Sequence, residues 1–249
     1  MKKTKKSAAI NLIFFVATLV VNFLGAIGYI FGNSQSDISD KFKTVLTPAG
    51  YAFSIWGLIY TLIPVSFVMV FFFKDKDDLE EIIGRISPFF ILSSIFNIAW
   101  IFLYSYGNML LSIIAIVLLA ISLLVIVYKL NGVNTEGILN IYPITFGIYA
   151  GWVCLASFIN FANYVVQLTN GSVLGPNDTG YGLLLLFILF VTGVIVCLTS
   201  RNAAFLLPYI HAALAIKVEV SKVNPDFPVL VLYILMLLAA GLVIYSFVY

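Results

Sequence analysis

The chain is poor in the residues that most enzyme chemistry requires. It has one histidine and two cysteines, and only 10% of its 249 residues are charged. Cys154 and Cys197 form no Cys-x-x-Cys pair and have no histidine near them in the sequence, which argues against a metal or redox centre. No Ser/His/Asp pattern and no phosphate-binding glycine loop is present. We therefore predict no catalytic residue, no metal ligand and no required cofactor.

The charge balance excludes further classes. A net charge of +2 without a basic stripe gives no support for nucleic-acid binding. Glu219 is the only carboxylate inside an apolar run, which argues against a proton pump with an acidic relay.

Apolar residues, by contrast, are abundant. They make up 62% of the chain, and the mean hydropathy is +1.10. A soluble domain is about half apolar and about a quarter charged. Lipid must therefore surround most of this surface, and we expect an all-α integral membrane protein.

Uncharged runs and polar breaks predict eight membrane-spanning helices. The first run is too long for a signal peptide, and "YSYGN" divides the run from 86 to 128 into two spans. "SQSDISDKFKT" is expected to be a polar loop, and "KDKDDLEE" a solvated loop or short surface helix. The spans are about 7–31, 47–73, two within 86–128, 139–166, 181–199, 203–218 and 229–247.

Lysine and arginine are more frequent in the segments on the side of the N-terminus. The positive-inside rule therefore places both termini in the cytoplasm. We expect a multi-pass protein of a bacterial cell membrane whose partners are membrane lipids and a hydrophobic small molecule, and not nucleic acid.

The three tryptophans occupy the same local pattern on three predicted helices. Residues at i, i+3 and i+7 share one helix face. The pattern comprises Phe53, Trp56 and Tyr60; Asn97, Trp100 and Tyr104; and Tyr149, Trp152 and Ala156, continued by Asn160 and Asn163.

Three interpretations of this pattern remain open. Tryptophan and tyrosine gather at headgroup depth, although Trp152 lies near the middle of its span. Membrane asparagines usually bond to a neighbouring helix, as we expect for Asn11 and Asn22, and this can apply to Asn97 and Asn160. Aromatic walls with a few polar groups are also the usual composition of a small-molecule site.

The motifs resemble those of the TspO/MBR family, the translocator or tryptophan-rich sensory proteins. The resemblance covers roughly residues 9–166. The chain departs from the family pattern at Gly50, Ser54, Ile148 and Leu155. The matching positions are Pro48, Trp56 and Tyr60 in "TPAGYAFSIWGLIY", then Asn97, Trp100, Leu103 and Tyr104, then Tyr149, Trp152, Ala156 and Asn160.

The resemblance implies a five-helix bundle over residues 1–166, with about three additional helices in 167–249. Family members bind tetrapyrroles such as porphyrin or haem, and some bind sterols or drug-like molecules; a light-dependent porphyrin breakdown and a sensory role have been proposed for bacterial members. The implied ligand-binding residues are Phe53, Trp56, Tyr60, Asn97, Trp100, Tyr104, Tyr149, Trp152, Ala156 and Asn160.

Three further sequence features can each be interpreted in more than one way. His211 is either a haem ligand or relay residue, or is satisfied by a backbone carbonyl or a polar side chain. The Gly147-xxx-Gly151 step permits close helix contact and weakly indicates a homodimer. Pro64, Pro143 and Pro208 are compatible with broken helices around a central site, as in a small-solute transporter.

Overall fold

The computed structural model describes residues 2–73, 77–133 and 135–248. Within these residues the regular structure is helical, with no strand. The helices are α1 (Lys2–Ala26), α2 (Gln35–Lys41), η1 (Gly50–Ser54), α3 (Ile55–Phe72), α4 (Asp77–Ser105), α5 (Met109–Leu130), η2 (Gly137–Asn140), α6 (Ile141–Thr169), α7 (Thr179–Ser200), η3 (Ala203–Leu206), α8 (Leu207–Val223) and α9 (Val229–Val248).

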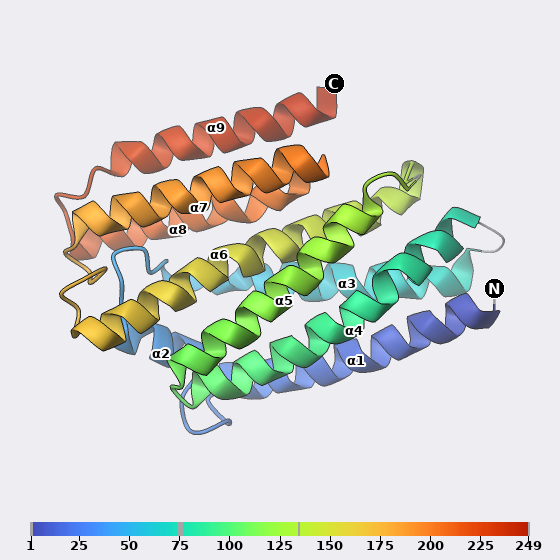
Figure 1. Ribbon diagram of the computed structural model, residues 1–249, viewed down its shortest axis with the longest axis horizontal. Coiled ribbons are helices and arrows are strands. Elements are labelled where there is room, and N and C mark those ends of the chain that lie inside the picture. The colour runs from blue at the N-terminus through green and yellow to red at the C-terminus, as the bar shows by residue number, and fades with distance from the viewer. Residues whose placement is uncertain (1, 74–76, 134, 249) are drawn as a thin grey trace.

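Five of the long helices close into a ring. Helix α1 packs against α3 and α4, α4 against α5, α5 against α6, and α6 against α3. Helices α7 and α8 contact α6 on one flank of this ring, α9 lies beyond them, and the two chain ends lie toward the same end of the bundle (Figure 1). The end that carries α2 is the opposite one, and it holds the aromatic residues of interest.

The predicted spans are confirmed as helices, and local signals define several of their ends. Gly107 adopts a φ of 82°, and the side chain of Asn108 accepts from the N–H of Leu111 at 3.2 Å, which begins α5. Asp178 caps α7 in the same way through Tyr181. Helix α1 ends at Ala26 instead of near residue 31, and α4 begins at Asp77 instead of near residue 86.

Two polar segments differ from the sequence-based expectation. "SQSDISDKFKT" contains helix α2, where Ser34 and Asp37 form a reciprocal capping box. The acidic part of "KDKDDLEE" is the first turn of α4, where carboxylates are favoured by the helix dipole. Residues 74–76 of that segment lie outside the described residues.

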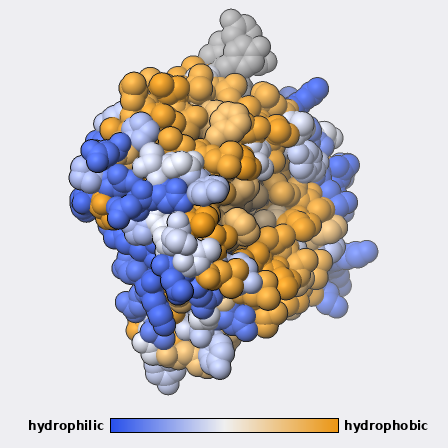
Figure 2. Space-filling view, turned by 60° about the vertical axis from the view of Figure 1, so that its left-hand side comes forward, coloured by the Kyte–Doolittle hydropathy of each residue, from blue (hydrophilic) through white to orange (hydrophobic). Residues whose placement is uncertain are grey.

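The outer surface is suited to lipid. In the described part of the chain, seven helices are long and apolar enough to cross a membrane, and α9 adds a shorter apolar stretch, Val229–Ile244. Large side chains such as Ile13, Phe23, Phe187 and Leu237 are more than 60% exposed. A broad hydrophobic band lies between hydrophilic margins in Figure 2, as expected for an integral membrane protein.

The half of the five-helix ring nearer the N-terminus is solidly packed. Phe67, Phe90 and Phe146 are buried and contact one another, with ring centroids 4.8 to 6.4 Å apart. Tyr142 lies on the same side and donates to the carbonyl of Ser66 at 2.6 Å. We call this region the packed half.

The Gly147-xxx-Gly151 step is used inside the chain. A Cβ at Gly147 would collide with the side chain of Asn202, and one at Gly151 would collide with the carbonyl oxygen of Phe205. The step therefore lets η3 approach α6 closely. The homodimer stays a prediction, but this motif no longer supports it, because its small-residue face is already covered.

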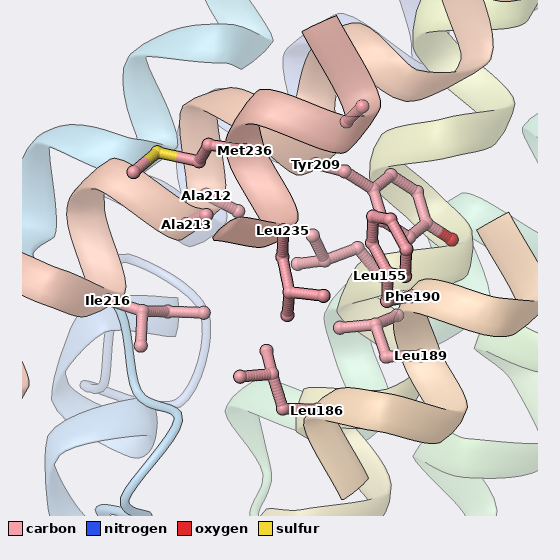
Figure 3. Close-up of a pocket in the computed structure, with 11 residues that line it drawn as sticks. Leu155, Leu186, Leu189, Phe190, Tyr209, Ala212, Ala213, Ile216, Leu235 and Met236 are labelled. Carbon is pink, nitrogen blue, oxygen red and sulfur yellow. The ribbon is translucent and has the colours of Figure 1, made fainter. Parts of the chain in front are cut away.

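The C-terminal helices are joined to α6 by apolar packing. Leu186 from α7, Ile216 from α8 and Leu235 from α9 point toward one another around a gap of about 20 Å³ (Figure 3). A lining of apolar side chains and a volume near that of one water molecule mark this gap as a packing defect and not a ligand site.

Candidate functional site: an aromatic pocket

The three tryptophans converge from three helices. Trp56 of α3, Trp100 of α4 and Trp152 of α6 all line one narrow hollow of about 40 Å³. The rings of Trp56 and Trp152 meet edge to face with centroids 6.4 Å apart. The narrow hollow is lined by Gln35, Ser39, Pro48, Phe53, Trp56, Trp100, Tyr104, Trp152, Ala156, Ile159 and Asn160.

A larger hollow of about 380 Å³ adjoins it. The two share Gln35, Phe53, Trp56 and Trp100, so they are parts of one site, which we call the aromatic pocket. Helices α1 and α2 close the other side of the larger hollow. Its lining residues are Leu19, Asn22, Phe23, Ala26, Gln35, Ser36, Gly50, Phe53, Trp56, Tyr60, Trp100 and Ile101.

A third hollow, of about 370 Å³, is polar and shares Phe53 with both parts of the aromatic pocket. We call it the vestibule. It contains the ion pair between Lys43 and Glu219. Its lining residues are Ser36, Ser39, Asp40, Lys43, Thr47, Pro48, Gly50, Phe53 and Glu219.

Aromatic contacts hold the walls of the pocket in place. Trp56 stacks on Tyr60, with centroids 5.2 Å apart and planes inclined by 24°. Phe53 meets Trp152 edge to face at 6.4 Å, and Tyr149 meets Trp56 at 6.0 Å. Such geometries add to the stability gained by burial of the rings.

Asparagines join the helices around the pocket. Asn22 of α1 donates to Oδ1 of Asn97 at 2.5 Å, and Asn97 donates to the hydroxyl of Tyr149 at 3.2 Å. Asn11 also bonds to another helix, through Ser87 at 2.8 Å. The expected role of Asn11 and Asn22 in helix association is therefore confirmed.

A second group lies closer to the hollow. Trp100 Nε1 donates to Oδ1 of Asn160 at 2.9 Å, and Asn160 Nδ2 donates to Ser112 Oγ at 2.9 Å. Asn163 donates to the hydroxyl of Tyr104 at 2.9 Å. Asn160 thus joins α4, α5 and α6, as the helix-association interpretation predicts, and it also lines the pocket.

Two polar atoms of the pocket walls are left without a partner among the described residues. They are Nε1 of Trp152 and the hydroxyl of Tyr60, and both are shielded from solvent. A buried donor without an acceptor costs free energy. The side chain of Trp152 is only 2% exposed. The indole N–H of Trp100 has an acceptor, Asn160, so the missing acceptor distinguishes Trp152 from Trp100.

The structure brings most of the predicted site residues together. Asn97 and Tyr149 are the exceptions: each lies three residues further from the pocket end than the tryptophan of its helix, about 4.5 Å along the axis. They bond to each other instead. The predicted residues that line the pocket are Phe53, Trp56, Tyr60, Trp100, Tyr104, Trp152, Ala156 and Asn160.

The walls from α1 and α2 do not follow from the motif spacing. For Asn22, an amide in an apolar run, the sequence predicts only helix association, and it predicts a loop for Gln35 and Ser39, yet all three line the pocket. The Ser-x-x-Asp spacing of Ser34 and Asp37 was the available signal for α2. The Ser34 hydroxyl and N–H both donate to Asp37, which lowers the pKa of that carboxylate.

His211 lies outside the aromatic pocket and the vestibule. Its Nε2 lies 3.1 Å from the carbonyl oxygen of Ala52, and its ring meets that of Tyr51 edge to face. Because a carbonyl only accepts, this nitrogen carries the proton. The alternative in which a backbone carbonyl satisfies the histidine is the one that the structure shows.

Fold and site together define a class: an all-α integral membrane protein with a pocket walled by aromatic side chains. A family model described as TSPO-like protein matches residues 8–248, and the chain belongs to this family, as its three motifs predicted. The match continues through α7, α8 and α9, beyond the part that carries the motifs. No curated protein and no solved structure matches the chain.

Proposed function

We propose that this TspO/MBR-like protein binds a flat hydrophobic ligand in the aromatic pocket, a tetrapyrrole such as porphyrin or haem. A sterol or another lipid is the second ligand class. The observation that carries the proposal is the convergence of Trp56, Trp100 and Trp152 on one hollow. The adjoining hollow of about 380 Å³ lies within the range of small-molecule sites, roughly 300–1,000 Å³.

The polarity of the walls supports a largely apolar ligand. Aromatic faces provide stacking surface, while the few polar groups, among them Asn160 and the unpartnered N–H of Trp152, provide orientation. An acceptor atom on the ligand would satisfy that N–H. A sensory or porphyrin-handling role, including light-dependent breakdown, would follow from such binding.

The transporter alternative receives less support. Pro64 lies inside α3, which continues from Ile55 to Phe72, and Pro143 and Pro208 lie in the first turns of α6 and α8. None of the three prolines therefore interrupts a helix: two lie at helix starts, and α3 continues past the third.

Tryptophan fluorescence tests the proposal. Protoporphyrin IX added to the protein in detergent should quench most of the emission, because all three indoles lie at the pocket. Trp152→Phe should weaken binding, whereas Phe90→Leu, in the packed half, should leave the affinity unchanged. Absence of saturable quenching in the folded wild type would refute porphyrin binding. Solute flux in vesicles that is indifferent to porphyrin would favour the transporter.

Orientation is part of the proposal. With the N-terminus in the cytoplasm of a bacterial cell, as the lysine and arginine distribution favours, the pocket would open in the outer half of the bilayer. Membrane-impermeant labelling of a cysteine introduced at Ser36, compared with one introduced at Lys129, tests this placement in cells.

A further inference from the structure

The segment between α2 and α3, residues 43–52, leads directly into the pocket wall. Phe53 follows it and lines both parts of the aromatic pocket as well as the vestibule. Residues 44–49 are buried, although the sequence places them in a connection between two helices. Whatever holds this segment therefore fixes Phe53. We call it the rim.

The rim is held by the C-terminal part of the chain at four points. Lys43 forms an ion pair with Glu219 of α8. The N–H of Val45 donates to the carbonyl of Leu174 at 3.3 Å, and the N–H of Ala49 donates to the carbonyl of Ala215 at 3.0 Å. Finally, Ala52 accepts from His211 at 3.1 Å.

These four contacts are spread along the rim, and each joins residues that are far apart in the sequence. Lys43 and Glu219 are 176 positions apart, and Ala52 and His211 are 159 apart. Val45 and Leu46 belong to the same apolar cluster as Ile216 and Val220 of α8. The first part of the rim thus packs with the C-terminal helices, whereas Ala49 and Ala52 belong to the core cluster that contains the five-helix ring.

Helix α8 is a firm support for the rim. It packs against α9 and η3, and Figure 3 shows its side chains Ala212, Ala213 and Ile216 facing those of α7 and α9. Glu219 has a second partner, Lys222, at 3.3 Å. This arrangement orients the carboxylate toward the rim.

We propose that α8 is a working part of the ligand site: Glu219 and His211 are positioning residues that hold the rim and thereby set Phe53 against Trp152. The proposal rests on the proposed function for its ligand. It gives the C-terminal helices a role in a site whose three tryptophans come from α3, α4 and α6. The ion pair, which also lines the vestibule, is the point at which the rim opens to water.

Hydrogen exchange tests the hold on the rim without any ligand. In the full-length protein in detergent, the amides of Val45 and Ala49 should exchange about three- to fivefold faster in Glu219→Gln, as expected for loss of a partly exposed ion pair. The exchanged pair Lys43→Glu with Glu219→Lys should restore slow exchange. Glu81→Gln is the matched control, because it removes the ion pair with Arg85 at the other end of the bundle.

His211 is tested by a pair of variants. His211→Ala loses the donor to Ala52, whereas His211→Gln retains one. Faster exchange at Ala49 in the alanine variant, with partial recovery in the glutamine variant, is the expected result. Unchanged exchange at Val45 and Ala49 in both Glu219→Gln and His211→Ala would overturn the proposed hold on the rim.

The effect on the site is measured with protoporphyrin IX. Its dissociation, followed by recovery of tryptophan emission, should be several-fold faster in Glu219→Gln and restored in the exchanged pair. Faster exchange with unchanged dissociation would overturn the positioning role. A wild type that porphyrin does not quench would instead refute the proposed function, and the exchange results would still decide whether α8 holds the rim.

Discussion

The two halves of the five-helix ring use aromatic residues in opposite ways. In the packed half, the side chains of Phe67, Phe90 and Phe146 are buried, contact one another and carry no polar atom. At the α2 end, Trp56, Trp100 and Trp152 surround open volume, and the buried N–H of Trp152 has no partner in the part of the chain that the structure describes. Close packing stabilises a bundle, so a wall of large rings around a hollow indicates a region shaped for something other than stability.

The largest expected effect contrasts one phenylalanine from each half. Phe146→Ala should destabilise the protein by about 3–5 kcal/mol, because it empties a fully packed position. Denaturation in mixed micelles measures this change. Porphyrin affinity of the protein that remains folded should be unaltered.

Phe53→Ala should show the reverse. The ring is only partly buried, so the loss of stability should be about 1–2 kcal/mol, while removal of its contact with Trp152 should weaken porphyrin binding roughly tenfold. The same denaturation and fluorescence titrations apply. If Phe146→Ala and Phe53→Ala reduced the free energy of unfolding by the same amount and weakened porphyrin binding by the same factor, the distinction between the two halves would be wrong.

Ala156→Thr tests the volume of the narrow hollow. Two additional heavy atoms in a space of about 40 Å³ should obstruct a ligand and weaken binding about tenfold. Ser157→Thr, one position along the same helix and outside the lining of the hollow, is the control and should leave the affinity unchanged. Equal affinity of the wild type and Ala156→Thr in a titration would contradict the proposed location.

Asn160→Leu should have a moderate effect on stability. It removes the acceptor of Trp100 and the donor to Ser112, and interhelical hydrogen bonds in membranes contribute about 0.6 kcal/mol each on average. We expect a loss of about 1–2 kcal/mol, because the buried indole N–H of Trp100 is left without an acceptor, whereas Ser112 still donates to the carbonyl of Met109. A blue shift of the tryptophan emission would report the freed indole, because hydrogen bonding of the N–H stabilises the emitting state, and an unchanged spectrum would argue against the bond.

The smallest effect concerns α2. Because the pKa of Asp37 is lowered in the folded protein, its contribution to the helix cap is present above the ordinary aspartate pKa of about 3.9 and is lost as the pH falls through the lower folded value. Hydrogen exchange in α2 should therefore accelerate only under strong acid. Asp37→Asn should abolish this pH dependence, and an identical acid response in that variant would assign it to another group.

Much of the fold follows from local signals in the sequence. Uncharged runs define the long helices, and Gly107, Asn108 and Asp178 define turns and caps that depend on neighbouring residues alone. The spacing of Trp56 with Tyr60, or of Trp100 with Tyr104, fixes a shared helix face. These features required no knowledge of which helices pack together.

What was missed depends on tertiary contacts. Asn22 reaches the larger hollow because α1 packs between α3 and α4, and a single sequence does not reveal that order. Asn97 and Tyr149 fit the spacing but bond to each other at 3.2 Å, since their depth places them beside a polar partner. The ion pair of Lys43 with Glu219 joins segments with no local relation.

The close approach at Gly151 has a consequence for any shortened form of the chain. The carbonyl of Phe205 occupies the place where a side chain would stand, so α6 carries a furrow that fits one specific stretch of backbone. A protein cut after residue 166 would present that furrow to the bilayer, open to whatever helix arrived, including another copy of α6. Self-association in such a fragment would then reveal a lost internal partner, and not a property of the intact molecule.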